Sequence, residues 1–232
     1  EYGGAATYVA EHAPEGRRGF YTSWIQTTAT LGLFLSLLVI LGCRMATGDD
    51  FEKWGWRIPF IIGALLAVVA ALMRRNLHET ESFVAAKSVE RKESSLRALM
   101  RYPRELMLVV GLTMGGTAAF YTYTTYMQKY LKLTVQLTSE QTTLVTAGSL
   151  LFAMCLQPIY GALSDVIGRK WLLIGFGVAG TLFTIPLLTA LQTASGALEA
   201  FFLIAAAWII VSGYTSINAV VKAELFPTTV RA

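Results

Sequence analysis

The sequence predicts an all-α integral membrane protein. Of its 232 residues, 54% are apolar and only 15% are charged, and the mean hydropathy is +0.52. A soluble domain carries about 25% charged residues, so the composition disfavours an ordinary water-soluble enzyme. The charged residues leave six long stretches without any charge, and about 20 apolar residues suffice for a helix to cross a bilayer. These stretches are 19–43, 58–73, 106–128, 141–164, 171–198 and 200–221.

Each uncharged stretch is interpreted as one membrane helix. Five are long enough to span the hydrocarbon core, and the stretch 58–73 is the short one. Trp54 and Trp56 precede it and two arginines follow it, and such interfacial side chains extend a short span. No short, lone apolar segment with a cleavage site comes first, so a signal peptide is not expected. Residues 1–10 are interpreted as the last turns of a preceding helix, which predicts that the chain is a central fragment of a longer protein.

The distribution of basic residues between alternate loops predicts the orientation. Basic residues in short loops are retained on the cytoplasmic side of a membrane. One set of loops carries 14 of the 19 Lys and Arg residues and the alternate set carries 5, so the first set is predicted to be cytoplasmic. That set consists of 1–18, 74–105, 165–170 and 222–232. Because these basic residues lie between spans, no nucleic-acid partner is expected.

A weak internal repeat predicts the architecture. Residues 10–19 and 223–232 share Ala, Glu, Pro and Arg at the same offsets. Six predicted spans separate the two copies, and an even number places both copies on the cytoplasmic side. Parallel repeats of six helices build a large class of secondary transporters.

Several motifs resemble a known family. Residues 161–170, with the sequence GALSDVIGRK, form a tight cytoplasmic turn between two spans and resemble the signature loop of the major facilitator superfamily. Further segments resemble its metabolite:proton symporter branch and, within that branch, the 2-oxoglutarate permeases. The segments for the branch are 1–5, 11–20 and 54–60, and those for the permeases are 120–131, 214–217 and 222–224.

The resemblance implies the major facilitator fold of two six-helix bundles, with this chain running from the end of span four to span ten of twelve. Residues 1–75 then end the N-terminal bundle, 76–104 form a central cytoplasmic linker, and 105–232 begin the C-terminal bundle. The implied function is proton-coupled symport of a small organic anion, 2-oxoglutarate, by rocking of the two halves. The implied setting is the bilayer of a bacterial inner membrane, with the protein working as a monomer.

Polar side chains in the span 106–128 predict a solute pathway. They follow one another in steps of four, four, three and four residues, which places them on one face of a continuous helix. A polar side chain inside a membrane is costly unless it faces a cavity or a partner. The alternative is that these hydroxyl groups only bond neighbouring helices. The predicted stripe consists of Thr113, Thr117, Tyr121, Thr124 and Gln128, and Lys129 adjoins its extracellular end.

Two other spans add candidate pathway residues. Tyr214 and Asn218 are four residues apart in the span 200–221, so they share a face. Gln157 precedes Pro158 in the span 141–164, where a proline frees a backbone carbonyl and can kink the helix. The prediction is a hinge at this point, and tolerance within helix packing is the alternative.

The charges that a dicarboxylate symporter requires are only partly in this sequence. An unpaired carboxylate in a low dielectric is costly, so two carboxylates need several donors or cations. Lys129 is the one cation that adjoins the stripe, which predicts a further cation outside this chain. Proton coupling requires an intramembrane carboxylate, for which Glu1 is the candidate here and a structural hydrogen bond is its alternative role. The family resemblance implies stronger candidates in the first span, which this chain does not contain.

Charged residues of the cytoplasmic loops are predicted to form a gate. Asp165 ends one helix and can cap a neighbouring helix N-terminus or pair with an arginine. Gly168 permits a tight or left-handed turn. By resemblance, the charges latch the cytoplasmic side shut in the outward-facing state, and the alternative is that they only set the topology. The predicted gate residues are Glu11 with Arg18, Asp165, Gly168 and Arg169, and Glu224 with Arg231.

Other patterns do not predict chemistry. Residues 175–180 match GxGxxG but lie inside an uncharged run without a preceding strand, so close helix packing is expected in place of a dinucleotide site. No cysteine or histidine has a partner at metal-ligand spacing, and no nucleophile, base and orienting group stand out. No catalytic residue, metal or cofactor is therefore expected. Citrate, shikimate and proline or betaine stay open as solutes, as do a membrane sensor and an inactive truncated remnant.

Overall fold

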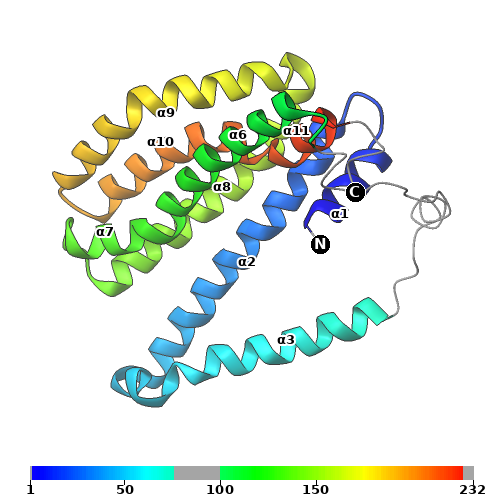
Figure 1. Cartoon of the computed structure of the whole chain (residues 1–232). Helices are drawn as coiled ribbons and strands as arrows, with labels where there is room; N and C mark the ends of the chain where they lie inside the picture. The colour runs from blue at the N-terminus through cyan, green and yellow to red at the C-terminus, as the bar shows by residue number, and fades with distance from the viewer. Residues whose placement is uncertain (1, 76–99, 227–232) are drawn as a thin grey trace. The chain divides into compact units, whose positions relative to one another are not determined.

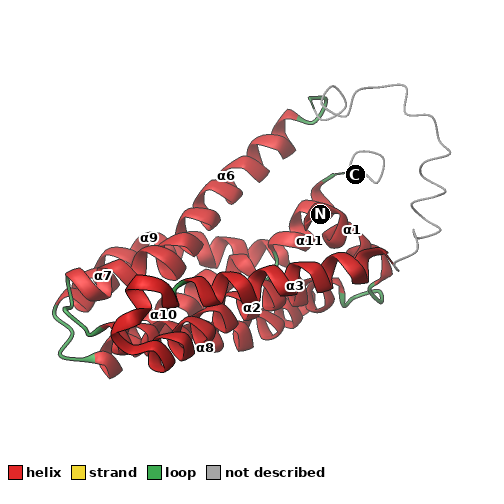
Figure 2. Ribbon diagram, turned by 90° about the horizontal axis from the view of Figure 1, so that it is seen from below, coloured by secondary structure: helices red, strands yellow, loops and turns green. Residues whose placement is uncertain are grey.

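The computed structural model describes residues 2–75 and 100–226, and every regular element in these ranges is helical (Figures 1 and 2). This confirms the predicted all-α class. Two π-helical turns, Phe51–Gly55 and Thr122–Tyr126, and a 3₁₀ turn, Gly48–Asp50, join some of the helices. The α-helices are α1 (Tyr2–His12), α2 (Arg18–Thr47), α3 (Arg57–Arg75), α6 (Pro103–Tyr121), α7 (Met127–Leu133), α8 (Ser139–Ile167), α9 (Arg169–Gln192), α10 (Ala197–Thr215) and α11 (Asn218–Leu225).

The chain divides into two compact units. One unit comprises Glu1–Leu37 with Pro103–Ala232, and the other comprises Leu38–Tyr102. In the first unit α10 packs along α8 and α9 and also contacts α6, while α11 contacts α1. Figure 1 shows α8, α9 and α10 running side by side, and Figure 2 shows the same from a second direction, in which α6 diverges from them. The predicted linker lies largely at 76–99, outside the described residues.

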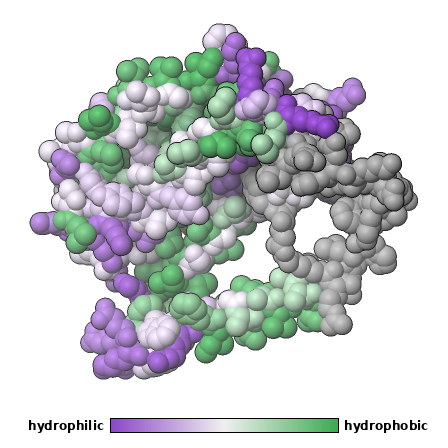
Figure 3. Space-filling model, viewed as in Figure 1, coloured by the Kyte–Doolittle hydropathy of each residue, from purple (hydrophilic) through white to green (hydrophobic). Residues whose placement is uncertain are grey.

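Helix α3 carries an almost wholly apolar surface. Its large side chains are exposed along the helix, including Phe60, Leu65 and Leu72. Figure 3 shows this surface in green, next to the hydrophilic turns that precede α3. In water such a surface is unfavourable, whereas in a bilayer it faces hydrocarbon.

Within residues 2–75 and 100–226, five helical stretches are long and apolar enough to cross a membrane. They are Arg18–Gly55, Pro103–Leu133, Ser139–Ile167, Arg169–Gln192 and Ala197–Leu225. The sixth predicted span corresponds to the shorter apolar helix Arg57–Met73. Each of the six uncharged stretches therefore contains at least part of a membrane-length or near membrane-length helix.

Three uncharged stretches do not coincide with single α-helices. The stretch 106–128 runs from α6 through the π-helical turn Thr122–Tyr126 into α7. The stretch 171–198 was predicted as one span, but α9 ends at Gln192 and α10 begins only at Ala197. The turn between them contains no charged residue. Its Ser195 donates two hydrogen bonds of 2.7 Å, from the backbone N–H and from the hydroxyl, to the carboxylate of Glu199 in α10. The length of the uncharged stretch therefore did not predict where α9 ends. The stretch 200–221 is likewise interrupted at Ser216 and Ile217, between α10 and α11.

The core of the first unit lies around α10. In the apolar segment of the span Ala197–Leu225, which contains α10, 67% of the residues are buried. In the apolar segments of the other four spans at most 28% are buried. Trp208 of α10 is fully buried and packs with Met127 and Leu150 from α7 and α8. An apolar helix surrounded by other helices is the expected centre of a bundle.

Local sequence signals account for the two ends of α8. At its start Thr138 accepts a hydrogen bond from the Gln141 backbone N–H, and the Gln141 side chain accepts one from Thr138 N–H, which forms a capping box. At its end Gly168 has a φ of +88°, a conformation that glycine adopts without steric cost. The predicted tight turn at Gly168 is confirmed, and it allows α9 to begin immediately at Arg169.

Candidate functional site

The carboxylate of Asp165, at the end of α8, caps the N-terminus of α2. Its Oδ1 accepts a hydrogen bond from the Gly19 N–H at 2.8 Å, and its Oδ2 accepts one from the Phe20 N–H at 2.9 Å. The first N–H groups of a helix have no partner within the helix and carry a partial positive charge. One carboxylate therefore satisfies two such donors on a helix that is distant in sequence.

The backbones of α2 and α8 approach closely at the same place. A Cβ atom at Gly19 would lie 2.6 Å from the Gly161 carbonyl oxygen, and a Cβ at Gly161 would lie 2.7 Å from the Gly19 carbonyl oxygen. Ser23 of α2 is fully buried against Gly161. Because only glycine fits at both positions, the contact depends on two small residues as well as on the cap.

Arg169, the first residue of α9, connects this contact to two further helices. Its NH1 group donates to Asp165 Oδ1 at 2.7 Å and to the Ser164 hydroxyl at 3.0 Å. Its NH2 group lies 3.4 Å from Glu224 Oε1 of α11. The Asp165 side chain is only 7% exposed and that of Arg169 21%, so water screens this ion pair less than one on an open surface. The cluster thus joins α2, α8, α9 and α11.

The other predicted gate residues have different surroundings. Glu11 and Arg18 are exposed and form no ion pair within residues 2–75 and 100–226. Glu224 was predicted to act with Arg231, but it pairs with Arg169, and Arg231 lies outside the described residues. The spacing of acid and base along the sequence did not identify Arg169 as a partner of Glu224, because the two residues belong to different helices. The pairing of Glu224 with Arg231 stays a prediction.

Two of the four segments predicted to be cytoplasmic, 165–170 and 222–232, meet at this cluster, together with residues that directly follow a third, 1–18. They contribute the start of α2, the turn between α8 and α9, and α11. Helices α1 and α11, which contain or adjoin the two copies of the repeat, also pack against each other. The described part of the second copy ends at Phe226.

A π-helical turn at Thr122–Tyr126 separates α6 from α7. The Thr122 hydroxyl donates to the Ala118 carbonyl oxygen at 2.8 Å, and the Thr124 hydroxyl donates to the Phe120 carbonyl oxygen at 2.8 Å. A wider turn weakens the regular backbone bonding of an α-helix, and these hydroxyl groups supply additional donors to carbonyl groups beside it. The threonine-rich sequence thus supports a local irregularity inside the membrane.

The π turn shows that one continuous stripe was a wrong prediction. A π turn rotates each residue less about the helix axis than an α turn, so residues beyond it leave the predicted face. Thr117 is exposed and Tyr121 is 59% exposed, whereas Thr124 is 5% exposed. Gln128 is half-buried, and its side-chain amide donates to the Thr124 carbonyl oxygen at 3.2 Å.

The same turn brings a different residue onto the exposed face. Tyr126, five residues after Tyr121, is 56% exposed, and Lys129 is exposed beyond it. The exposed polar side chains Thr117, Tyr121, Tyr126 and Lys129 are together called the exposed polar face of α6 and α7. Sequence analysis missed Tyr126 because it counted every residue at α-helical spacing.

Gln157 belongs to a buried network between α8 and α10. Its side-chain N–H group donates to the Ala153 carbonyl oxygen at 3.2 Å and lies 3.3 Å from the Ser212 hydroxyl, while its carbonyl oxygen accepts from the Thr215 hydroxyl at 3.0 Å. Gln157, Ser212 and Thr215 are at most 4% exposed. Gln157 was predicted to line the pathway, but it lies in the contact between α8 and α10, where its polar atoms already form hydrogen bonds.

Tyr214 and Asn218 share a face as predicted, although a break separates their helices. The Tyr214 hydroxyl donates to Asn218 Oδ1 at 2.9 Å, and the Tyr214 ring stacks on Phe176 of α9 with a centroid distance of 5.3 Å. Gly116 of α6 lies against this ring, because a Cβ there would be 1.8 Å from Tyr214 Cε1. The absence of a side chain at Gly116 thus allows α6 to approach α10.

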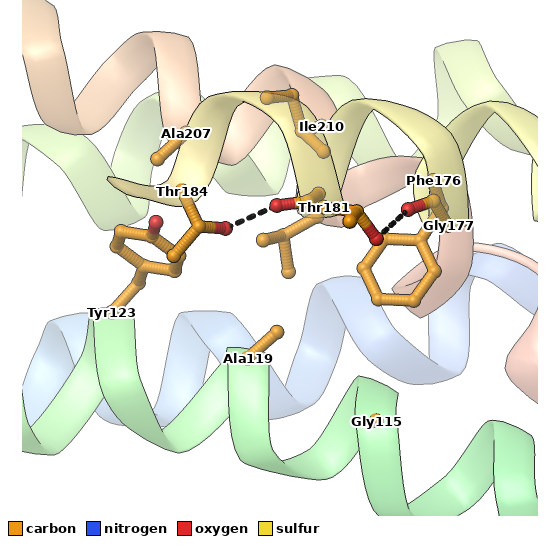
Figure 4. Close-up of a pocket in the computed structure, with 11 residues that line it drawn as sticks. Gly115, Ala119, Tyr123, Phe176, Gly177, Thr181, Thr184, Ala207 and Ile210 are labelled. Carbon is orange, nitrogen blue, oxygen red and sulfur yellow. Dashed lines mark hydrogen bonds between the residues drawn. The ribbon is translucent and has the colours of Figure 1, made fainter. Parts of the chain in front are cut away.

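A cavity of about 310 Å³ lies between α6, α9 and α10 (Figure 4). Gly177 and Gly180 line it, and a Cβ at either position would meet no atom within 4 Å. The close packing predicted for the glycines of 175–180 is therefore wrong, since these glycines leave open space. Figure 4 shows Tyr123 and Thr184 facing each other at one end of the cavity.

The proton-coupling candidate Glu1 lies outside the described residues.

Sequence comparison shows which proteins this chain is similar to. A family profile described as Major Facilitator Superfamily matches residues 2–232. An alpha-ketoglutarate permease of Escherichia coli (strain K12) is 44% identical over all of this chain and 54% of its own length. A citrate-proton symporter of Klebsiella pneumoniae is 32% identical over 84% of this chain and 44% of its own length. A proline/betaine transporter of Escherichia coli (strain K12) is 28% identical over all of this chain and 48% of its own length.

The chain thus spans about half the length of the curated relatives that it matches. No solved structure matches it significantly.

The contact between Gly116 and Tyr214 generates a prediction about adjacent glycines. Gly116→Ala should displace the Tyr214 ring and lower stability by about 1–3 kcal/mol, the usual cost of overpacking. Gly115→Ala is the matched control, because a Cβ at Gly115 would meet nothing within 4 Å and alanine favours a helix over glycine by about 1 kcal/mol. The thermal unfolding midpoint in detergent measures both variants. Equal midpoints would contradict the close approach of α6 to Tyr214.

Proposed function

Because the chain belongs to the major facilitator superfamily, we propose that its protein is a proton-coupled symporter of a small organic anion, with 2-oxoglutarate as substrate. The observation that carries this proposal is the 44% identity to an alpha-ketoglutarate permease along the entire chain. The proline/betaine transporter is 28% identical over the same residues, which favours the dicarboxylate over a zwitterion. Citrate is the second candidate, since a citrate-proton symporter is 32% identical.

The charge on the exposed polar face supports an anionic substrate. Thr117, Tyr121 and Tyr126 offer hydroxyl groups, and Lys129 adds a positive charge without a carboxylate partner in the described part of the chain. A zwitterion needs an anion and a cation together, whereas a dicarboxylate needs an excess of cations. We propose that Lys129 binds one carboxylate and that a cation outside the described residues binds the other.

The cytoplasmic cluster supports alternating access. We propose that Asp165, Arg169 and Glu224 hold the cytoplasmic ends of the helices together in the outward-facing state, and that these bonds break when the site opens inward. The π turn between α6 and α7 supplies the flexible point, and the bonded pair α8 and α10 moves as one body. The protein then works as a monomer in a bacterial inner membrane, with Glu1 as the candidate within this chain for the proton-carrying group.

Uptake of labelled 2-oxoglutarate tests the substrate. Proteoliposomes that contain the full-length protein should accumulate it faster with an inward proton gradient than without one, because the gradient drives a symporter. Unlabelled dicarboxylates should compete, and proline should not. Gradient-driven uptake of proline or citrate, but not of 2-oxoglutarate, would contradict the proposed substrate. No uptake of any of these solutes would contradict the proposal that the protein is a transporter.

A pair of lysines tests the role of Lys129. Lys129→Ala should raise the KM for 2-oxoglutarate about tenfold or more, because a charged hydrogen bond contributes about 1.5–3 kcal/mol. Lys132→Ala is the matched control, since Lys132 is also exposed on α7 but lies beyond the proposed pathway. An equal change in KM for both variants would indicate a general effect of charge and would contradict the assignment.

Neutralising Asp165 tests the cytoplasmic latch. In Asp165→Asn one carboxylate oxygen becomes an NH₂ group, which would face a backbone N–H of α2 because both oxygens now accept such bonds. We expect the uptake rate to fall about tenfold or more while the amount of protein in the membrane changes little. A cysteine at the buried position Ser23 should also become more reactive from the cytoplasmic side.

Glu224→Gln is the graded control for this latch. It removes only the longer contact to Arg169, at 3.4 Å, so its effect on uptake and on reactivity at position 23 should be smaller. If Asp165→Asn transported normally, or if both variants failed only because less protein reached the membrane, these charges would serve topology and not a gate.

A further inference from the structure

A groove opens between α6, α9 and α11, and none of the residues that line it belongs to the exposed polar face of α6 and α7. Its volume is about 490 Å³, which lies within the range of small-molecule and cofactor sites. Its wall is apolar and comes from all three helices. The wall residues are Leu108 and Leu112, Leu173 and Ile174, and Val221 and Leu225.

The charges on this groove are gathered at one end. Arg169, Lys170 and Glu224 also line it, and Arg169 forms ion pairs with Glu224 and with Asp165. Lys170 is exposed and forms no ion pair among the described residues. Lys170 therefore provides a positive charge beside the apolar wall that no described carboxylate neutralises.

The order of residues along α9 matches the layers of a bilayer. Arg169 and Lys170 belong to a segment that the distribution of basic residues places on the cytoplasmic side. Trp171 follows and is 63% exposed, and tryptophan is enriched at the level of lipid headgroups. Leu173 and Ile174 come next and lie deeper, on the apolar wall. The groove thus carries the unpaired Lys170, next to the ion pair of Arg169 and Glu224, where headgroups lie, and it is apolar where acyl chains lie.

We propose that this groove binds an anionic phospholipid of the cytoplasmic leaflet. Its phosphate contacts Lys170 and the guanidinium of Arg169, and an acyl chain lies along Leu108, Leu112 and Ile174. Basic pockets between membrane helices on the cytoplasmic side recognise such headgroups. A soluble anion would gain nothing from the apolar wall, so the lipid accounts for both parts of the groove.

Arg169 gives the proposed lipid a connection to the α2–α8 contact. Its NH1 group bonds Asp165 at 2.7 Å, whereas its NH2 group makes the longer contact to Glu224. A phosphate that replaces Glu224 at NH2 would leave the bond to Asp165 in place. The bound lipid would then hold Arg169 where it supports the Asp165 cap. This coupling rests on the proposed function, whereas lipid binding itself does not.

Lipid retention by the purified full-length protein tests the proposal. Native mass spectrometry after exchange into equal amounts of phosphatidylglycerol and phosphatidylethanolamine should show preferential retention of phosphatidylglycerol. Lys170→Gln should reduce that preference about fivefold, as expected for one lysine at an anionic surface. Lys132→Gln is the matched control, because this exposed lysine lies on α7. Equal retention of the two lipids, or an equal loss in both variants, would overturn the proposal.

Two further measurements distinguish the occupants of the groove. A photoreactive side chain at position 174 should form an adduct with phosphatidylglycerol, and an adduct only with another segment of the protein would overturn the proposal. Inorganic phosphate at millimolar concentration should not displace the lipid, and displacement would indicate a soluble anion. Neither readout requires transport, so failure of the proposed function and failure of lipid binding are distinguishable.

Discussion

The double hydrogen bond from the α2 N-terminus to Asp165 is the interaction on which the arrangement of the cytoplasmic ends depends. Hydrocarbon offers no partner for backbone groups or charges, so helix ends must be satisfied by water, headgroups or other protein groups. Here a single carboxylate serves two amides and an arginine at once. The reciprocal contact of Gly19 and Gly161 brings the backbones close enough for these bonds. Charge and small residues are therefore required together, and neither would position α2 alone.

The same constraint explains where irregular structure is tolerated. The π turn between α6 and α7 adjoins carbonyl groups that the Thr122 and Thr124 hydroxyls bond. The break between α10 and α11 is similarly accompanied by a bond from the Ser216 hydroxyl to the Ser212 carbonyl oxygen at 2.7 Å. Short hydroxyl side chains thus allow a membrane helix to change direction without leaving carbonyl groups unbonded. Both irregularities lie beside polar residues that were candidates for the pathway.

The sequence predicted those features that follow from one helix or one loop. Uncharged length predicted the spans, and the loop around Asp165 and Gly168 predicted both a helix cap and a tight turn. Pairings between distant helices were not predictable, since nothing in the spacing of Glu224 indicated Arg169 as its partner. The π turn was also missed, because α-helical counting assigns Thr124 and Tyr121 to one face. The glycines at 175–180 show the same limit: a small residue can permit close contact or leave a cavity, and only the neighbouring helix decides which.

The saturated amide of Gln157 has a consequence for how such proteins diversify. With Ser212, Thr215 and its own backbone, it fastens α8 to α10 without involving the exposed face of α6 and α7. Substitutions on that face can therefore accumulate without loosening the scaffold. Relatives named for solutes as different as alpha-ketoglutarate, citrate and betaine align with this chain. The hydrogen bonds of Gln157 hold α8 and α10 together, while the exposed face of α6 and α7 is free to vary. New solute preferences can therefore evolve while the fold is retained.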